Sequence, residues 1–273
     1  VIQADSIQNL GGRLTADQLS AKANKDINNV SGVIDAKQQL FLDAGENINI
    51  VTKSNTTQNN QGTNTHLNRQ AGVYVTAADG QGVLALNAGK DIQLNAGVIS
   101  NTSKEGITQL TAKNEINLGT TQVSRKQENI KDVNNYIKRS EQGEVGSQIQ
   151  VNNDVQLSAG NDINLRASEI HSEQGNVIAQ AQNINVESGE YTKTADDALK
   201  TKSKGFASKT TRIFKDSSEQ TQAISSVIGG QNVVLNAEQD ITVKGSHVVA
   251  DELTQLQAKG TVDIEAATNT SSS

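Results

Sequence analysis

Short stretches of this chain alternate apolar with polar residues, and small turns interrupt the alternation. In residues 83–97 a Gly89-Lys90-Asp91 turn separates two such stretches, whose apolar members are Leu84, Leu86, Ala88, Ile92, Leu94 and Ala96. A period of two predicts β-strands with one buried face. Two strands this short cannot bury that face alone, so they need copies of themselves as neighbours.

The same unit returns along the chain, each time with an Ile or Val after the turn. These residues are Ile7, Ile27, Ile48, Ile92, Ile116, Ile163, Ile184, Ile241 and Val262, at spacings of 20, 21, 44, 24, 47, 21, 57 and 21 residues. The pattern predicts an all-β solenoid, a parallel β-helix of about nine coils of roughly 20–24 residues. The step of 44 residues holds either two units or one unit plus an insertion. Neither the leucine-rich repeat pattern nor the calcium-binding nonapeptide pattern occurs in the sequence.

Three polar stretches interrupt the units, at about 53–71, 120–148 and 189–229. We expect these insertions to leave and rejoin the rod at coil corners, because solenoids carry insertions on their loops. The whole chain, 1–273, is then a single β-helix segment. The chain begins without Met and shows no leader, so it is expected to be a piece of a larger protein.

The turn before each aligned Ile carries recurring small and polar residues. Gly45, Gly89 and Gly160 follow an Ala at this turn and are predicted to adopt a positive φ. Acidic residues precede the Ile at Asp91, Asp162 and Asp240, where they are predicted to bond the turn backbone. Stacked Asn side chains are expected to form ladders between coils. Because these residues recur in coil after coil, they indicate a structural role rather than a single active site.

Composition narrows the possibilities further. Aromatic residues make up 2% of the chain and hydrophobic residues 34%, which suits a thin, uniform core better than a bulky one. The regular spacing of those residues argues against disorder for the body of the chain. The absence of Cys excludes disulfides and thiolate metal sites, and the absence of Pro suits central strands. A net charge of -6 disfavours a nucleic-acid partner.

The sequence offers little catalytic chemistry. His66, His171 and His247 are scattered without a metal-ligand spacing, so no metal or cofactor is expected. The prediction is that the chain is not an enzyme. Two alternatives stay open. A β-helix polysaccharide-degrading enzyme needs clustered carboxylates that do not repeat from coil to coil. A haem- or haemoglobin-binding exoprotein needs His or Tyr close to Phe.

One basic patch stands out in the last insertion. It contains no acidic residue between its first and last member and consists of Lys200, Lys202, Lys204, Phe206, Lys209, Arg212, Phe214 and Lys215. The pattern is typical of a surface that meets a membrane, lipopolysaccharide or a partner protein. The alternative is a solvated loop that its two Phe residues anchor to the rod.

The repeats resemble a known family. Residues 157–165, Leu-Ser-Ala-Gly-Asn-Asp-Ile-Asn-Leu, are similar to the repeat unit of filamentous haemagglutinins and of the large contact-dependent growth inhibition proteins. The block 233–271 resembles their second haemagglutinin-repeat region, with Gly245-Ser246 after one unit and Ala-Ala-Thr-Asn-Thr at 266–270 after the next. The resemblance implies a right-handed parallel β-helix without catalytic residues or cofactor.

The resemblance also implies a function. Such proteins leave Gram-negative bacteria by two-partner secretion, through an outer-membrane transporter that recognises a domain absent here. They form long surface fibres that act in adhesion or carry a toxin to a neighbouring cell. We therefore expect a non-enzymatic stalk segment, secreted or on the cell surface. Its expected partners are the rest of the same fibre, the transporter and, through the insertions, a target-cell outer membrane or receptor.

Overall fold

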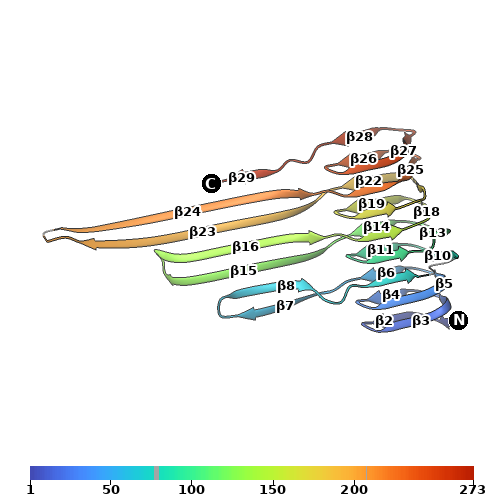
Figure 1. Ribbon diagram of the computed structural model, residues 1–273, viewed down its shortest axis with the longest axis horizontal. Coiled ribbons are helices and arrows are strands. Elements are labelled where there is room, and N and C mark those ends of the chain that lie inside the picture. The colour runs from blue at the N-terminus through green and yellow to red at the C-terminus, as the bar shows by residue number, and fades with distance from the viewer. Residues whose placement is uncertain (77–79, 207) are drawn as a thin grey trace.

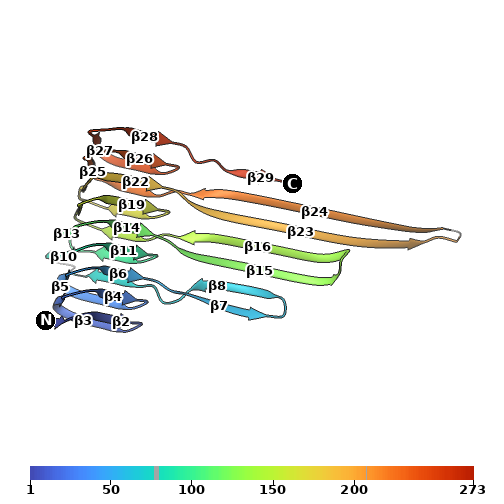
Figure 2. The same ribbon diagram turned by 180° about the vertical axis from the view of Figure 1, so that it is seen from behind.

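The computed structural model describes residues 1–76, 80–206 and 208–273, and these residues form strands joined by turns. The strands build a rod of stacked coils and a set of long hairpins that extend from one side of it (Figures 1 and 2). Within the described residues, no helix is long and apolar enough to cross a membrane.

One face of the rod is a parallel sheet, here called the anchor sheet. In the described residues it has nine strands, in spatial order β2 (Ile7–Leu10), β4 (Ile27–Val30), β6 (Ile48–Val51), β11 (Ile92–Asn95), β14 (Ile116–Gly119), β19 (Asp162–Arg166), β22 (Asn183–Glu187), β26 (Ile241–Lys244) and β28 (Val262–Glu265). Each strand holds one of the nine residues aligned from the sequence. The order in space equals the order along the chain, as in a solenoid.

A second parallel sheet, the bent sheet, forms the other two faces of the rod. One face contains β1 (Ile2–Ala4), β3 (Arg13–Ala23), β5 (Val33–Ala44), β10 (Gln81–Ala88), β13 (Glu105–Ala112), β18 (Asp154–Ala159), β21 (Val177–Ala181), β25 (Val227–Ala237) and β27 (His247–Ala258). The other contains β9 (Gly72–Val75), β12 (Val98–Asn101), β17 (Gln148–Val151) and β20 (Glu169–Ser172). Long strands such as β5 and β25 pair on both faces, which joins the two into one sheet.

The core consists of ladders of stacked aliphatic side chains. Ile48 lies beside Ile92, Ile92 beside Ile116, and Ile116 beside Ile163. All four side chains are fully buried. β-branched residues suit such a pleated, packed surface. The pairing of Ile48 with Ile92 also settles the 44-residue step, which is one coil with an insertion. The predicted fold class, an all-β parallel solenoid, is confirmed, while its hand and coil number stay predictions.

The glycine turn differs from its prediction. In the described chain, positive φ occurs elsewhere: after anchor-sheet strands at Gly11, Ser31, Ala96, Ala167 and Gly245, and also at Gly62 and Gly80. Gly45, Gly89 and Gly160 are not among the residues with positive φ, so that expectation was wrong. Their common feature is a close approach of two coils. An ideal Cβ on any of the three would lie 2.0 Å from a carbonyl oxygen of the preceding coil.

The turn carboxylates bond to the next coil rather than to their own turn. Asp91 Oδ1 accepts hydrogen bonds from the Glu115 backbone N–H at 3.0 Å and from Asn114 Nδ2 at 2.6 Å. Asp162 and Asp240 accept hydrogen bonds from the following coil in the same way, at 2.8 and 2.7 Å. Asn ladders run beside them, and Nδ2 atoms donate across coils in the pairs Asn49–Asn28, Asn164–Asn117 and Asn185–Asn164.

Candidate functional site: the hairpin sheet

The three predicted insertions contain long antiparallel hairpins. These are β7 (Ser54–Asn59) with β8 (Gly62–Leu67), β15 (Thr121–Asp132) with β16 (Asn135–Val145), and β23 (Gly189–Lys204) with β24 (Lys209–Ile224). Together with β29 (Thr270–Ser272) they form one seven-stranded sheet within the described residues, here called the hairpin sheet. Figure 1 shows the hairpins side by side, with β23–β24 reaching furthest from the rod.

A match of spacings explains why the hairpins meet. Hairpins follow β6, β14 and β22, whereas the chain passes directly from β11 to β12 and from β19 to β20. Every second coil in this region therefore carries a hairpin. Neighbouring strands lie ~4.8 Å apart, so two coils rise about 9.6 Å, and one two-stranded hairpin is also about 9.6 Å wide. Successive hairpins consequently arrive one strand spacing apart and pair with each other.

Cross-strand contacts hold this single layer together, since most of its side chains are exposed. Arg139 on β16 makes a bidentate pair with Asp197 on β23. This pair keeps the pKa of Asp197 below its usual value. Next to it, the Tyr136 hydroxyl donates to Asp196 Oδ1 at 3.0 Å, and the Lys138 ammonium lies 4.8 Å from the Tyr136 ring centroid. Opposite charges and aromatic contacts of this kind stabilise exposed sheets.

The base of the second hairpin is tied to the rod. Arg166, at the end of β19, donates to both carboxylate oxygens of Glu144 on β16 at 2.9 Å. The Glu144 side chain is largely buried, with 13% of it exposed. A bidentate pair of a planar guanidinium with a carboxylate fixes direction as well as distance. The second hairpin therefore leaves the rod in a defined direction.

The basic patch lies on the outer part of the third hairpin. Pairing of β23 with β16 ends at Ala198, so residues 199–204 and 209–214 form a two-stranded ribbon beyond the rest of the sheet. Seven of the eight candidate residues lie on this ribbon or directly at its base, and Phe206 lies between its two strands at the tip. Phe206 is fully exposed and Phe214 is 57% exposed. The alternative that the two Phe residues anchor a loop to the rod is therefore wrong.

The strand register divides the patch between two faces. Directly opposite residues share a face, and neighbours along a strand alternate between faces. The observed pairs Lys200–Ile213, Lys202–Thr211, Lys204–Lys209 and Ala198–Lys215 put five lysines on one face, called the lysine face: Lys200, Lys202, Lys204, Lys209 and Lys215. Leu199, Phe214 and Arg212 lie on the opposite face, called the phenylalanine face.

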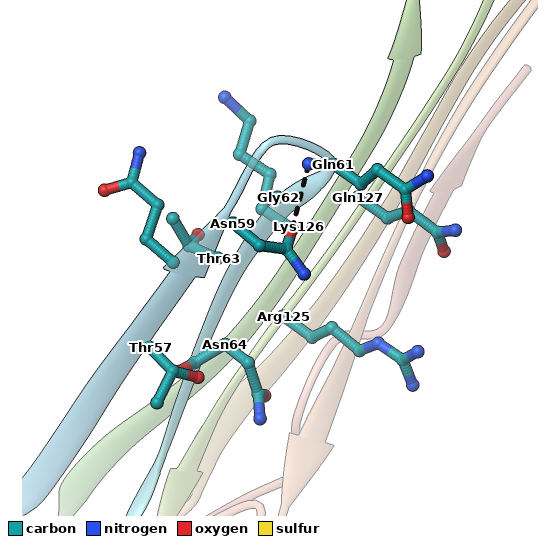
Figure 3. A pocket seen from close by; sticks show the side chains of 10 residues that line it. Thr57, Asn59, Gln61, Gly62, Thr63, Asn64, Arg125, Lys126 and Gln127 are labelled. Carbon is teal, nitrogen blue, oxygen red and sulfur yellow. Dashed lines mark hydrogen bonds between the residues drawn. The ribbon is translucent and has the colours of Figure 1, made fainter.

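A polar hollow lies at the tip of the first hairpin. It has a volume of about 470 Å³ and is lined by residues of β7, β8, the turn between them and β15, including Asn59, Gln61, Arg125 and Lys126 (Figure 3). The Gln61 backbone N–H donates to Asn59 Oδ1 at 2.9 Å within it. Its lining contains amides, hydroxyls and two cations. These groups bind hydrogen-bonding or anionic ligands, but they do not form the carboxylate pair that glycosidic cleavage needs.

The histidines do not converge. His66 lies on β8, His171 on β20 and His247 on β27, in three separate strands. Among the residues that the structure describes, no group of three or more His, Asp or Glu side chains could hold a metal ion.

Sequence reasoning missed the hairpin sheet as a unit, although a signal was present. From Ile48 onward the spacings of the aligned residues are 44, 24, 47, 21, 57 and 21, so long and short steps alternate. The alternation shows that every second coil carries an insertion. It does not show the strand register that sorts the basic patch onto two faces.

Comparisons with known proteins agree with this architecture. The sequence pattern of the family described as "Hemagglutinin repeat" matches residues 133–213 and 207–273, just over half of the chain. The tRNA nuclease CdiA of Escherichia coli (strain STEC_O31) is 28% identical over 281 residues, covering 94% of this chain and 8% of that protein. The protein of the same name from Escherichia coli O6:K15:H31 (strain 536 / UPEC) is 44% identical over 75 residues, covering 27% of this chain and 2% of that protein.

The chain thus spans a small fraction of the length of the relatives it matches. No solved structure matches it. The stacked coils, their strand-by-strand register and the sequence match from the second strand of the second hairpin through the third hairpin point the same way: the chain belongs to the hemagglutinin repeat family.

Proposed function

We propose that this chain is a non-enzymatic stalk segment of a long surface exoprotein, an adhesin or a contact-dependent inhibition protein exported by two-partner secretion. The stacking of its coils carries the proposal. At one end of the rod, β28 exposes 40% of Val262 and 67% of Ile264 on an open parallel edge. Another coil of the same kind buries such side chains and completes such an edge. A segment of this type acts as a rigid spacer that supports domains elsewhere in the same protein.

The use of carboxylates supports a non-enzymatic role. The recurring turn carboxylates accept hydrogen bonds from the neighbouring coil and so hold the coils together; they are Asp91, Asp162 and Asp240. The half-buried carboxylates of Asp196 and Asp197 are paired with cations across strands. A polysaccharide-degrading enzyme requires two free carboxyls that face one substrate. The described residues offer no observation that favours this alternative or haem binding.

The outer ribbon of the third hairpin is the proposed contact with another cell. Its 16-residue strands reach about 50 Å from the rod at ~3.4 Å per residue. Lys204 and Lys209 lie directly opposite each other on the lysine face, a like-charge pair that costs stability. A phosphate-bearing surface relieves that repulsion, and each lysine adds attraction to an anionic membrane. The outer surface of a Gram-negative cell, rich in lipopolysaccharide phosphate, fits this chemistry.

Binding to outer-membrane vesicles from Gram-negative bacteria tests the proposal. In one variant, the five lysines of the lysine face are changed to Gln. In a matched control, five exposed rod lysines are changed instead: Lys22, Lys25, Lys37, Lys90 and Lys259. We expect the ribbon variant to bind at least about tenfold more weakly than the control, because its lysines meet the surface together.

Both variants lose five positive charges, so a difference in their vesicle binding shows that the position of the lysines matters. Far-ultraviolet circular dichroism of all proteins checks that the sheets remain. Equal binding by the two variants, or no binding by the unmodified chain, refutes the ribbon as a contact surface.

A further inference from the structure

A second hollow lies on the hairpin sheet, between β8, β15, β16 and β23. It has a volume of about 330 Å³, which is within the range of about 300–1,000 Å³ typical of small-molecule sites. Its lining includes His66, Val123, Gly143 and Tyr191, and it is here called the aromatic hollow. All four strands are interior strands of the sheet that the structure describes, so the hollow is independent of either sheet edge.

Two features of the sheet produce the aromatic hollow. Gly143 has no side chain, and the Tyr191 ring leans over it from the next strand: an ideal Cβ on Gly143 would lie 3.0 Å from Tyr191 Cδ2. Pairing between β8 and β15 stops at Thr65–Ser124, and the two strands separate toward the rod, as Figure 1 shows. Tyr191 therefore has one side of its ring against the sheet and lines the hollow with the rest of it.

A row of polar side chains borders the aromatic hollow. Arg125 lies opposite Asn64 on one side and opposite Glu141 on the other, and all three line the hollow. Glu141 is also near Lys193 on the next strand, whose Nζ lies 3.7 Å from Glu141 Oε1. Arg125 is exposed and belongs to none of the ion pairs of the described residues. The row thus carries two cations and one anion, and it attracts an anionic group.

The aromatic hollow continues into the polar hollow at the tip of the first hairpin. Asn64 and Arg125 line both hollows, and both side chains are drawn in Figure 3. The strand register puts Arg125, Glu141 and Gly143 on the phenylalanine face of the hairpin sheet. The two hollows together form an elongated site. Tyr191 lies at one end of it, Arg125 in the middle, and amides and hydroxyls at the other end.

We propose that this elongated site binds an acidic oligosaccharide. A pyranose ring has a face of C–H groups, which packs on a partly exposed aromatic ring such as that of Tyr191. Arg125 is a diagonal neighbour of Gly143, about 7–8 Å away, so its guanidinium reaches a carboxylate on the same sugar ring. Further sugars place their hydroxyls along the polar hollow, where side-chain amides and hydroxyls both donate and accept hydrogen bonds.

Other classes of ligand fit the site less well. A neutral sugar leaves the Arg125 guanidinium without an anion, and an apolar ligand leaves the whole polar row without hydrogen-bond partners. A phosphate-rich surface gains more on the lysine face, where five lysines lie together. The lysine face is the opposite face of the hairpin sheet, so the oligosaccharide site is separate from the proposed contact with a target cell.

Isothermal titration calorimetry tests the site with two probes, a trisaccharide of galacturonic acid and the same trisaccharide after reduction of its carboxyl groups. We expect the acidic probe to bind at least about tenfold more tightly, because charge-assisted hydrogen bonds are stronger than neutral ones. Arg125→Gln is expected to remove this preference and to leave the affinity for the reduced probe unchanged. Arg212→Gln, on the same face but outside the site, is the matched control and keeps the preference.

A second pair of variants tests the aromatic end and the choice of face. Gly143→Val fills the aromatic hollow and displaces the Tyr191 ring, while a β-branched residue suits a strand. It is expected to weaken the binding of both probes by about tenfold or more. The variant with Gln at the five positions of the lysine face is expected to keep both affinities. Far-ultraviolet circular dichroism checks that the sheets remain in all variants.

Acidic sugars occur both in lipopolysaccharide and in the glycans of animal cells. Methyl glycosides of ketodeoxyoctonate and of N-acetylneuraminic acid, titrated separately, distinguish the two sources. Each is expected to bind more tightly than its own carboxyl-reduced form. Tighter binding of the first glycoside indicates a bacterial glycan, and tighter binding of the second indicates an animal glycan.

Four results overturn the proposal. The unmodified chain binds the acidic and the reduced trisaccharide equally, or it binds neither, or Arg125→Gln behaves as Arg212→Gln does, or the variant of the lysine face loses the acidic probe. Vesicle binding is assigned to the lysine face and oligosaccharide binding to the opposite face, so failure of one proposal is distinguishable from failure of the other.

Discussion

Deleting one coil between two hairpins is predicted to separate the hairpin sheet while leaving the rod intact. Removal of residues 148–168 joins Ser147 to Glu169. The junction keeps the register, because Gln148 pairs with Glu169 in the rod and Val98 pairs with Gln148. After the deletion, β12 stacks directly on β20. In a solenoid each coil contacts only its neighbours, so the shortened rod remains a complete stack.

The magnitude follows from the strand spacing. The second and third hairpins then leave consecutive coils, about 4.8 Å apart, although each needs about 9.6 Å of width. β23 is displaced by one strand spacing and cannot lie beside β16. The eight residue pairs between these strands are lost, together with the Arg139–Asp197 pair. About eight backbone hydrogen bonds belong to such a stretch of antiparallel ladder.

Hydrogen–deuterium exchange measured by mass spectrometry is the assay. We expect amides of β16 and β23 that pair with each other to exchange on the order of 100-fold faster, since they become open edges. Amides of β21 and β25 in the rod report that the coils remain folded. A matched control removes residues 98–168, which is one coil with its hairpin plus one coil without. In this control β23 arrives beside β8, so the part of β23 nearest the rod stays protected.

Unchanged protection of β16 and β23 after removal of 148–168 refutes the reasoning. So does equal loss of protection in the control, because the spacing argument then has no part in holding the hairpins together.

Two further predictions concern a single corner and a single ion pair. Gly89→Ala is expected to lower the free energy of unfolding by about 1–3 kcal/mol, measured in urea, because the new Cβ lies 2.0 Å from the Gly45 carbonyl oxygen. Equal stability of the variant and the parent contradicts this explanation of the glycine. For the pair Arg139–Asp197, the pKa of Asp197 is lowered, so its stabilisation is present above the unfolded pKa of about 3.9 and disappears as the pH falls through the folded value. The protection factors of β16 amides, which are exchange rates referred to the intrinsic rate at each pH, are therefore expected to fall below about pH 4, and Asp197→Asn is expected to reduce that fall; an unaltered profile speaks against it.

The rod could be predicted from the sequence because the spacing of the aligned Ile residues gives its strand register. Each aligned Ile stacks on the Ile one coil away, as Ile163 does on Ile184, so the distance between repeats gives the strand pairing directly. In most other sheets the pairing partner of a strand depends on tertiary packing, and the sequence of the strand alone does not reveal it.

The corner geometry could not be predicted in the same way. Left-handed backbone is found at Ser31, Ala96 and Ala167 as well as at two glycines, so residue type gives only a weak signal there. The recurring glycine of the other corner reports a close approach between coils. Distances between coils depend on the path of the whole chain, which the local pattern does not contain.

The sequence identified the residues of the candidate surface, but it did not show how they are divided between the two faces of the ribbon. A run of six cations with two Phe residues marks the stretch Lys200–Lys215 in one dimension. The reversal of the chain between Lys204 and Lys209 then determines which residues face each other. In this register the five lysines lie on one face of the ribbon, and Arg212 and Phe214 lie on the other. Sequence spacing alone does not establish that separation.

The direction of the backbone hydrogen bonds has a mechanical consequence. The bonds between coils run along the rod axis, so a force that pulls the two ends apart loads them in tension, coil by coil. The hairpin sheet runs beside the rod, and its hydrogen bonds point along the same axis. It is joined to the rod where each hairpin leaves the stack. Between Ser54 and Ile224 an axial load is therefore shared by the rod and the hairpin sheet. A coil of the rod cannot open there without straining the hairpin sheet beside it.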